Sequence, residues 1–403
     1  MRKSIYSTPE SGVTVVGIPA RNEADTIAAV AHAADLGLRL ACPGGDNLIV
    51  LADNGSTDGT PERFLAAATN TPRQVVSSPA ANTGKGTNVL ALVHKALEVR
   101  ADRLILLDAD LRSAQPEWIG QLAAAVSGPA PTMAVPVYRR NRYEANTTNH
   151  LARPLVAALF GRHLAQPIGG EFALNRALLE RVVEWPVPGS ALFYGIDIWL
   201  TTNSVREGYQ VAEVSLGRKL HNSPFPKILH LPQQVLDSLF HVAVRAGQPD
   251  PASLDTAAAQ HAVDIEAVPQ DPALVGRVGA TVRGYLDAHQ PVIRRMFPTV
   301  AGLPTAPWGV RIRTQDWPVL LANSIQALAG GQFQAARDHL IALYINRVLS
   351  FFEEIEQLSD SETNALLDRQ TRHTAKAISE RSVTFAPGTA PQTFDRGYWT
   401  GIG

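Results

Sequence analysis

Short apolar runs alternate with helix-like stretches through the first half of this chain. Residues 13–19, 48–52 and 104–107 form such runs, and residues 23–36 and 87–99 carry helix-like patterns between them. A short apolar run bounded by polar residues is typical of a buried central strand. The alternation therefore predicts an α/β fold with a mostly parallel, doubly wound sheet and helices on both faces. In sheets of this kind, ligands bind at the carboxyl ends of the strands.

The pattern changes in the second half of the chain. From about Pro232 onward the sequence is mainly helical, with amphipathic helices expected within residues 271–297 and 317–357. We therefore predict two regions: residues 1–230, which contain the sheet, and residues 231–403, a mainly helical C-terminal region. The helical region either packs onto the first domain or forms a separate one, and its apolar faces favour a homodimer.

The composition excludes several classes of protein. A net charge of −1 over 403 residues provides no general attraction to nucleic acid or to an anionic membrane. Cys42 is the sole cysteine, which excludes an intrachain disulfide and a cysteine-based zinc site. Residues 1–12 are polar and unlike a secretory signal, and no apolar stretch reaches membrane-spanning length. We therefore expect a cytoplasmic protein that binds neither nucleic acid nor membrane.

Asp108-Ala109-Asp110 follows the apolar run at residues 104–107 directly. Two carboxylates at positions i and i+2 project to the same side of an extended chain. Such a pair suits a hard divalent cation, which prefers oxygen ligands and bridges to the phosphates of a nucleotide. An isolated Asp-x-Asp is more often part of a solvated loop, so this motif gains its weight from the residues around it.

Other polar motifs fall on the same edge of the predicted sheet. Asn54 follows the second strand, and Gly84-Lys85-Gly86 opens the helix before the Asp-Ala-Asp strand. Glycine permits close backbone approach and Lys85 offers a cation to a nucleotide or its phosphate, although the spacing is not that of a Walker A loop. Plainer interpretations exist: a strand-to-helix turn for Lys85, helix capping for Asn22, and a strand end for Asp53.

The motifs form an ordered set that extends along the chain. In order they are Pro19-Ala20-Arg21-Asn22-Glu23, Asp53-Asn54-Gly55-Ser56-Thr57-Asp58, Gly84-Lys85-Gly86, Asp108-Ala109-Asp110, Ala152-Arg153-Pro154-Leu155, Gln166-Pro167-Ile168-Gly169-Gly170-Glu171, Gly195-Ile196-Asp197 and Lys219-Leu220-His221. Over residues 13–225 the set resembles the retaining glycosyltransferases of the mannosylglycerate synthase and glucosyl-3-phosphoglycerate synthase type. The resemblance implies that residues 1–230 form a single Rossmann-like, GT-A-like domain that binds a nucleotide-sugar and carries catalysis.

The resemblance also implies a donor site and a metal site. The residues that it assigns to the donor are Pro19, Ala20, Asn22, Glu23, Asp53, Lys85, Asp108, Ala109, Asp110 and Gly170. Asp110 and, as a more distant ligand, His221 would hold Mg²⁺ or Mn²⁺ against the donor phosphates, where the ion is a Lewis acid. Asp108 would reach the ribose or the water shell of the metal. A carboxylate and an imidazole with open water positions suit these ions better than zinc.

The catalytic candidates are Asp110, Glu171 and Asp197. Gly169-Gly170 would place Glu171 on a tight turn close to a sugar, and Asp197 is the second carboxylate near the transferred hexose. Two mechanisms stay open. One uses a carboxylate nucleophile, as retaining glycosidases do. In the other, which the resemblance favours, the leaving phosphate accepts the acceptor's proton on the same face while both carboxylates position hydroxyls and stabilise positive charge on the ring.

The basic stretch at residues 139–142 points to an anionic acceptor, because a guanidinium binds a carboxylate through two parallel hydrogen bonds. The residues that the resemblance assigns to the acceptor are Arg142, Thr147, Gly169 and Asn222. Phosphoglycerate synthases of this type usually have His-Arg-Asn where this chain has His221-Asn222-Ser223, which favours D-glycerate over 3-phosphoglycerate. We therefore predict transfer of mannose or glucose, from GDP-mannose, GDP-glucose or UDP-glucose, to the 2-hydroxyl of D-glycerate.

Several alternatives stay open. One is a glucosyl-3-phosphoglycerate synthase, and another is an inverting glycosyltransferase, which needs a general base near its acceptor. A sugar nucleotidyltransferase would need a glycine-rich, arginine-containing loop directly after the first strand, and residues 17–21 lack it. A non-catalytic sugar-nucleotide sensor would keep the nucleoside pocket without the metal ligands, whereas Asp110 and His221 are both present.

Overall fold

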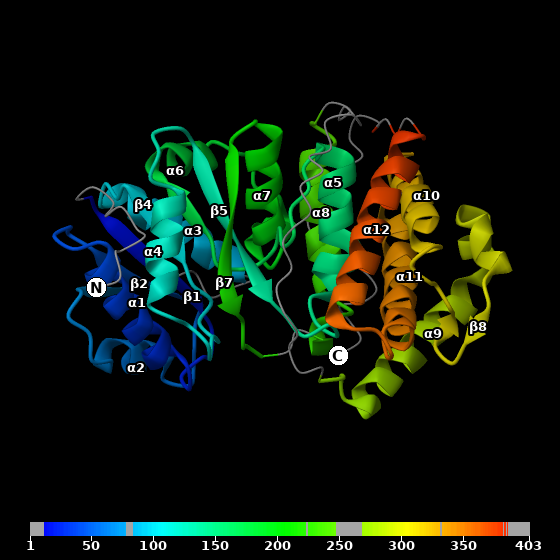
Figure 1. Ribbon diagram of the computed structural model, residues 1–403, viewed down its shortest axis with the longest axis horizontal. Helices are drawn as coiled ribbons and strands as arrows, with labels where there is room; N and C mark the ends of the chain where they lie inside the picture. The colour runs from blue at the N-terminus through cyan, green and yellow to red at the C-terminus, as the bar shows by residue number, and fades with distance from the viewer. Residues whose placement is uncertain are drawn as a thin grey trace. The chain divides into compact units, whose positions relative to one another are not determined.

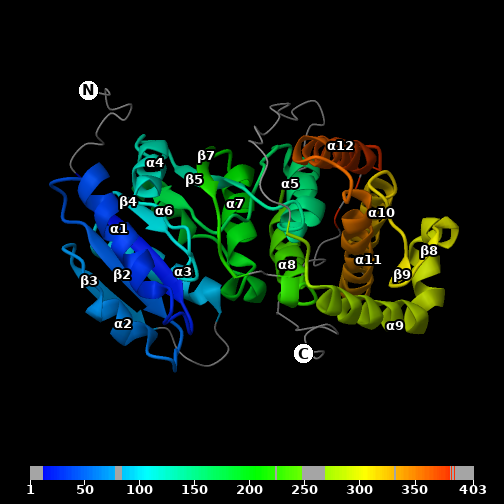
Figure 2. The same ribbon diagram turned by 60° about the horizontal axis from the view of Figure 1, so that its bottom comes forward.

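The structure, a computed structural model, describes residues 12–77, 84–222, 225–246, 268–330, 333–381, 383 and 385. The chain forms two compact units: Met1–Tyr138 with Ile168–Asn222, and Arg139–Pro167 with Ser223–Gly403. Figures 1 and 2 show a sheet with flanking helices in the first unit and an assembly of helices in the second. The predicted α/β fold with a mainly helical C-terminal part is confirmed.

The first unit contains a seven-stranded sheet in the order β3-β2-β1-β4-β6-β5-β7. Its strands are β1 (Thr14–Ala20), β2 (Leu48–Asp53), β3 (Arg73–Ser77), β4 (Arg103–Leu106), β5 (Thr132–Arg139), β6 (Ala173–Asn175) and β7 (Gln210–Arg218). Its helices are α1 (Ile27–Ala41), α2 (Thr60–Ala66), α3 (Lys85–Glu98), α4 (Glu117–Ala125), α6 (Arg176–Val182), α7 (Ile196–Arg206) and the 3₁₀ turn η2 (Gly189–Leu192).

The register of the sheet brings the polar motifs to one edge. β1 pairs in parallel with β2 and β4, and β2 pairs in parallel with β3. Ala20 lies opposite Asp53, and Gly17 lies opposite Leu106. β6 runs antiparallel to both β4 and β5. Because the four neighbouring strands β3, β2, β1 and β4 share one direction, the loops that follow them lie on a common side of the sheet.

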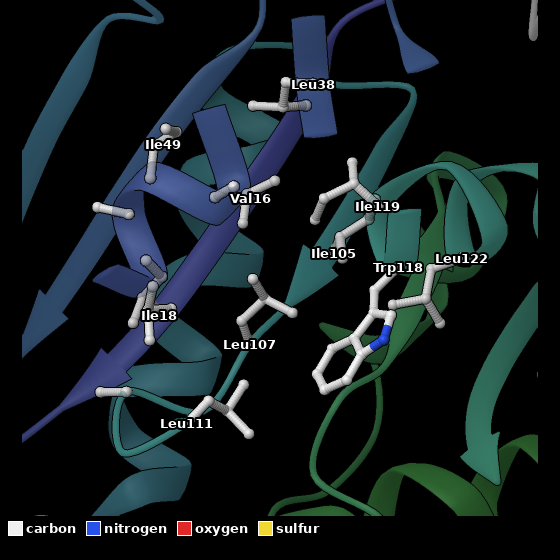
Figure 3. Close-up of a cluster of buried hydrophobic side chains, with 14 of the residues drawn as sticks. Val16, Ile18, Leu38, Ile49, Ile105, Leu107, Leu111, Trp118, Ile119 and Leu122 are labelled. Carbon is white, nitrogen blue, oxygen red and sulfur yellow. The ribbon is translucent and has the colours of Figure 1, made fainter. Parts of the chain in front are cut away.

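Strand periodicity explains how the first unit builds its core. Alternate residues of a strand face opposite sides, so Val16 and Ile18 point to one face and join Ile105 of β4 there. Helices α1 and α4 cover that face, with Trp118 among their contributions (Figure 3). On the opposite face α3 packs on β1, β2 and β4. The sheet is therefore covered by helices on both sides, as the sequence predicts.

The second unit is helical. Its elements are the π-helical turn η1 (Thr148–Ala152), α5 (Arg153–Phe160), η3 (Phe225–Lys227), α8 (Leu231–Ala243), α9 (Pro272–Met296), η5 (Pro298–Gly302), α10 (Trp317–Ala329), α11 (Phe333–Glu354), α12 (Asp360–Ser379) and the short strands β8 (Thr305–Ala306) and β9 (Gly309–Val310). α11 is buried around most of its circumference and packs on α8, α9 and α10. A capping box of Ser359 and Glu362 starts α12.

One segment groups differently from the predicted division at residue 230. Residues 139–167 belong to the second unit, whereas the sequence placed them in the first. The physical reason lies in α5, which packs along α12, where Arg153 forms an ion pair with Asp368. The indole of Trp317 also donates a hydrogen bond to the carbonyl of His150, at 2.8 Å. Within the part of the chain that the structure describes, no helix is long and apolar enough to cross a membrane.

Candidate active site

Asp108 lies directly beyond β4, between two lysines of the first unit. Its Oδ1 is 2.8 Å from Nζ of Lys85, and its Oδ2 is 3.0 Å from Nζ of Lys219. Lys85 is the first residue of α3, and Lys219 follows β7. Burial by itself raises the pKa of a carboxyl, but the two ammonium groups outweigh it and hold the pKa of Asp108 well below its usual range. Asp108 is therefore ionised, and both of its oxygens are engaged.

The glycines beside Lys85 fix its position by close packing. A Cβ on Gly86 would lie 1.8 Å from the carbonyl oxygen of Ala191, and a Cβ on Gly84 would lie 2.7 Å from the ring of Phe193. The amides of both glycines donate to carbonyls of the segment at 192–193, at 3.2 and 3.0 Å. This segment leads directly into α7. The glycines thus bring Lys85 against α7, where its Nζ is 3.2 Å from Oδ2 of Asp197.

A second pair of glycines places Glu171 beside Asp108. Gly170 has φ of +98°, a conformation that favours glycine, and a Cβ there would lie 2.4 Å from Oδ2 of Asp108. A Cβ on Gly169 would lie 2.2 Å from the ring of Pro136 in β5. No other residue fits at either position without moving a neighbour. The sequence predicts close approach of this turn to a sugar, and in the structure the turn approaches Asp108.

Glu171 is completely buried, with both carboxylate oxygens engaged. Nζ of Lys219 donates to Oε1 at 2.8 Å and to Oε2 at 2.7 Å, and the hydroxyl of Tyr138 donates to Oε2 at 2.8 Å. Burial, reinforced by the charge of Asp108, raises the pKa of Glu171 to about 7 even though Lys219 opposes the shift. Glu171 therefore titrates close to neutral pH.

Asp197 differs from Glu171 in that one of its two carboxylate oxygens is unpaired among the described residues. It is 9% exposed, and its Oδ2 binds Lys85, but its buried Oδ1 has no hydrogen-bond partner within the described residues. Burial raises the pKa of Asp197, and the charge of Lys85 only partly offsets this. An unpaired buried acceptor costs free energy unless a donor arrives. A hydroxyl of a bound ligand is a donor of the required kind.

Asp110 and His221 form a pair next to this cluster. Oδ2 of Asp110 is 3.9 Å from Nδ1 of His221. No group of three or more His, Cys, Asp or Glu side chains within the described ranges gathers closely enough to hold a metal without help. Mg²⁺ is commonly bound by one or two carboxylates together with substrate phosphates and water, so the pair fits such an ion. Both carboxylate oxygens of Asp108 already bind lysines, so Asp108 is not expected to bind the ion directly.

The loop that carries Asp110 is tied to the segment that carries His221. The amide of Arg112 donates to the carbonyl of Leu220 at 2.8 Å, and a guanidinium nitrogen of Arg112 lies 3.1 Å from Oδ1 of Asn222. The amide of Leu220 in turn donates to the hydroxyl of Ser113 at 2.8 Å. These bonds hold the predicted metal ligands in one place, and they bring an exposed arginine beside Asn222.

The residues assigned to the nucleoside lie at the ends of β1 and β2. Asn22, at φ of +57°, donates its amide to the hydroxyl of Ser56 and accepts from the amide of Thr57. The carboxylate of Asp53 accepts from the hydroxyl and amide of Ser56, at 2.6 and 3.0 Å. These bonds join the loop after β1 to the loop after β2. Helix α1 begins at Ile27, so Asn22 does not cap it.

The remaining donor candidates lie around these loops. The amide of Glu23 donates to the hydroxyl of Thr60 at 2.8 Å. Pro19 and Ala20 end β1, and the carbonyl of Ala20 accepts a hydrogen bond from the side chain of Asn88 at 3.1 Å. The carbonyl of Ala109 accepts from the hydroxyl of Thr26 at 2.7 Å. These contacts join the loop after β1 to the Asp-Ala-Asp loop.

The two acceptor candidates Arg142 and Thr147 lie in the second unit and have partners there. The guanidinium of Arg142 donates to the carbonyl of Leu358 and lies 3.7 Å from the carboxylate of Asp360. The hydroxyls of Thr147 and Tyr344 are 3.2 Å apart. The structure thus gathers the lysine, carboxylate, glycine and metal candidates in the first unit, whereas these two residues are held within the helical unit.

Sequence reasoning assigned no role to two residues at the centre of the cluster. Lys219 is 5% exposed and Tyr138 is 4% exposed, and the ammonium of Lys219 also lies over the ring of Tyr138, 5.4 Å from its centroid. Lys219 is the first residue of the motif Lys219-Leu220-His221, and its place in that motif was the only sequence feature that could have indicated a role for it. Tyr138 closes an ordinary apolar strand pattern and gave none.

A family model and several solved structures are similar to part of this chain. The model for Glycosyl transferase family 2 matches residues 15–183, from β1 to the end of α6. Glucosyl-3-phosphoglycerate synthase from Mycobacterium tuberculosis in complex with phosphoglyceric acid is 26% identical with a TM-score of 0.50, over 62% of this chain and 88% of that one. No curated protein matches the chain at a significant level.

Further structures of the same mycobacterial enzyme are similar to this chain. Its complex with Mn²⁺, UDP-glucose and phosphoglyceric acid is 27% identical with a TM-score of 0.48, over 59% of this chain and 81% of that one. Its complex with Mg²⁺ and UDP has the same identity, TM-score and coverage. The resemblance that the motifs predicted is confirmed. Residues 15–183 match the family 2 glycosyltransferase model, and the protein is a glycosyltransferase.

Proposed function

We propose that this glycosyltransferase is a metal-dependent retaining enzyme that transfers a hexose from a nucleoside diphosphate sugar to the 2-hydroxyl of D-glycerate. One observation carries the proposal. The lysine–carboxylate cluster of Lys85, Asp108 and Asp197 lies in the same unit as the Asp110–His221 pair, which fits a divalent ion. A nucleotide-sugar donor has a diphosphate at one end and a sugar at the other. The divalent ion would bind the diphosphate, and the unpaired carboxylate oxygen of Asp197 would accept a hydrogen bond from the sugar.

Asp110 and His221 hold Mg²⁺ or Mn²⁺ in this proposal. The ion supplies positive charge to the diphosphate, whose negative charge grows as the bond to the sugar breaks. Asp108 does not need to ligate the ion directly, because Lys85 and Lys219 already neutralise it. Its ionised carboxylate is held between the two lysines and would contact the ribose or the water shell of the metal.

Asp197 is the carboxylate that contacts the transferred hexose in this proposal. Its Oδ1 has no hydrogen-bond partner in the described part of the chain, so a sugar hydroxyl completes it. Glu171 has both oxygens bound by Lys219 and Tyr138, which leaves neither of them open to attack a sugar carbon. This arrangement favours same-face transfer, in which the leaving phosphate accepts the acceptor's proton, over a covalent intermediate on Glu171.

A second acceptor, 3-phosphoglycerate, is supported by a separate observation. The mycobacterial relative that is 26% identical was solved with phosphoglyceric acid. This chain lacks the arginine usual after the histidine of that motif, but the guanidinium of Arg112 lies 3.1 Å from the side chain of Asn222. Arg112 thus supplies a cation from another loop to the same neighbourhood. D-Glycerate stays the first candidate because Arg112 is exposed at its position on the loop surface.

The decisive experiment measures nucleoside diphosphate release by the purified protein with Mg²⁺ or Mn²⁺. GDP-mannose, GDP-glucose, UDP-glucose and ADP-glucose are each tested with D-glycerate, with 3-phosphoglycerate and without acceptor. Release that requires D-glycerate supports the proposal and identifies the donor, and the anomeric configuration of the product by NMR tests retention. Release that requires 3-phosphoglycerate supports the second candidate. Release that neither acceptor stimulates contradicts both.

Three further expectations accompany the proposal. Apolar helix faces favour a homodimer, which light scattering of the purified protein tests. A cytoplasmic location is tested by fractionation of cells that express the full chain.

Alanine at Arg142 is expected to raise the KM for the acceptor without changing the KM for the donor, and unchanged acceptor kinetics would remove Arg142 from the site.

A further inference from the structure

Lys219 occupies the centre of the buried cluster and contacts three predicted site residues at once. Its Nζ binds Oδ2 of Asp108 at 3.0 Å, the carbonyl oxygen of Gly169 at 2.9 Å and both oxygens of Glu171. An ammonium group has three N–H donors, so the four contacts use its full capacity. Its side chain is 3% exposed, too little to reach a substrate directly. Lys219 therefore acts on the site through its neighbours.

We propose that Lys219, held by Glu171 and Tyr138, is a positioning residue that fixes the carboxylate of Asp108 and the Gly169-Gly170 turn in the geometry that the donor requires. The inference rests on the proposed function and deepens it. Glu171 then contributes by anchoring Lys219, and it does not touch the sugar. Tyr138 contributes by bonding Oε2 of Glu171 from β5.

The geometry favours this role over that of an ordinary structural ion pair. Lys219 joins three segments that are far apart in the chain, separated from it by 111, 50 and 48 residues. Two of its contacts, Asp108 and the Gly169 carbonyl, belong to segments placed at the donor and acceptor by their motifs. A shift of about 1 Å in groups of this kind is sufficient to lower turnover about 100-fold.

The protonation state of Glu171 gives the inference a characteristic readout. Glu171 binds Lys219 most strongly when ionised, and its pKa is about 7. The charged groups that face it are Lys219 after β7, Asp108 after β4 and Lys85 on α3, with the Tyr138 hydroxyl from β5. As the pH falls through 7, Glu171 gains a proton and the anchor of Lys219 weakens. Activity is therefore expected to fall on the acid side with an apparent pKa near 7.

Two substitutions test the arrangement at different strengths. Lys219→Met keeps the length of the side chain and removes its charge, and is expected to lower kcat/KM for the donor about 100-fold. It also removes the ammonium that ionised Glu171 holds, so the acid limb caused by protonation of Glu171 is expected to disappear. Tyr138→Phe removes one hydroxyl that stabilises ionised Glu171, keeps the ring and Lys219, and moves the limb upward by about half a pH unit.

Controls separate positioning from simple loss of structure. Tyr209→Phe makes the same chemical change at a tyrosine that stacks on Trp185 outside the cluster, and its pH profile is expected to match the wild type. Rates are normalised to the folded fraction from thermal unfolding at each pH, with the metal at saturation. If Lys219→Met does not fold, the comparison of Tyr138→Phe with Tyr209→Phe decides. A limb that does not move in Tyr138→Phe overturns the inference.

A measurement without turnover distinguishes failure of the inference from failure of the proposed function. Calorimetry measures the binding of UDP and GDP with Mn²⁺ to the wild type, to folded Lys219→Met and to Tyr138→Phe. Nucleotide affinity at least about tenfold weaker in Lys219→Met supports the positioning role, even if the wild type transfers sugar to none of the acceptors tested. Equal affinity together with an unshifted pH limb in Tyr138→Phe refutes the positioning role while leaving the transferase intact.

Discussion

Each unit of this protein buries a cluster of charges, and the two clusters are completed differently. In the helical unit all three nitrogens of the Arg347 guanidinium donate hydrogen bonds, to Gln370, Ile312, Glu354 and Thr314. In the sheet unit the carboxylates of Asp108, Glu171 and Asp197 share two lysines, and one oxygen of Asp197 has no partner among the described residues. Every guanidinium nitrogen of the first cluster has a partner, whereas the second cluster keeps one acceptor oxygen without a partner among the described residues.

Perturbed pKa values occur in both clusters, because burial also lowers the pKa of Arg347 to about 10, so the nature of the partners has to distinguish the two. Burial of ions is offset in a structural cluster by matched partners, and breaking such a pair leaves an uncompensated charge. In the sheet unit, burial raises the pKa of both Glu171 and Asp197, since the two lysines do not neutralise every carboxylate. Groups shifted by burial and specific charges are concentrated at functional sites. The unpaired oxygen of Asp197, more than burial alone, makes the sheet-unit cluster the candidate active site.

The largest expected effect concerns the Asp110–His221 pair. Asp110→Ala removes the carboxylate proposed to hold the divalent ion, and kcat/KM is expected to fall at least about 1000-fold, because metal assistance supplies several kcal/mol to leaving-group departure. Initial rates over a titration of Mn²⁺ measure the loss. Asp46→Ala, at an exposed residue before the amino end of β2, is the control and is expected to keep wild-type rates. Activity that survives both Asp110→Ala and chelation would contradict metal assistance.

The next effect concerns the contact between Gly170 and Asp108. Gly170→Ala places a Cβ 2.4 Å from Oδ2 of Asp108, so the carboxylate has to move and kcat/KM is expected to fall about 100-fold. Gly208→Ala is a matched control, because Gly208 also has a positive φ of +72° but has no heavy atom within 4 Å of the added Cβ. The two variants share the backbone strain and differ in the clash. Equal activities would show that displacement of Asp108 does not matter.

The third prediction breaks a complete pair in the helical unit. The carboxylate of Asp237 accepts two hydrogen bonds from Arg337, and both side chains are 1% exposed. Asp237→Ala leaves a buried arginine undercompensated, and the free energy of unfolding is expected to fall by about 3 kcal/mol. Asp287→Ala, which breaks the exposed pair with Arg283, is expected to cost less than about 1 kcal/mol. Denaturant titrations measure both, and equal losses would contradict the distinction.

The last prediction is a change in how stability depends on pH. The pKa of Glu171 is raised in the folded protein to about 7, above its value of 4.5 in the unfolded chain. Between pH 4.5 and 7 the folded state therefore binds more protons at Glu171, so its contribution to stability falls as the pH rises. Glu171→Gln removes this contribution. The stability of the variant relative to the wild type is expected to rise with pH over that window, and a flat difference in denaturant titrations would refute the shift.

Much of the fold was accessible to sequence reasoning because its signals are local. The strand at residues 13–19 was predicted from its apolar run and appears as β1 over Thr14–Ala20. Helices α9 and α10 appear where amphipathic patterns placed them. The grouping of residues 139–167 with the helical unit was not predicted, because the contact of Arg153 with Asp368 joins positions 215 residues apart.

The sequence by itself determined the alternation of strands and helices, the edge of the sheet at which the motifs meet, and the ordered motifs that identify the family. Periodicity and turn chemistry act between neighbours in the chain, so they leave a readable pattern. Only the tertiary structure decided that Lys219 and Tyr138 surround Glu171, and that Asp197 keeps an unpaired oxygen. Tyr138 is 33 positions from Glu171 in the chain, and Lys219 is 48 positions from it, so no local pattern indicates these contacts. The burial and the neighbouring charges that set the pKa values also arise only when the chain has folded.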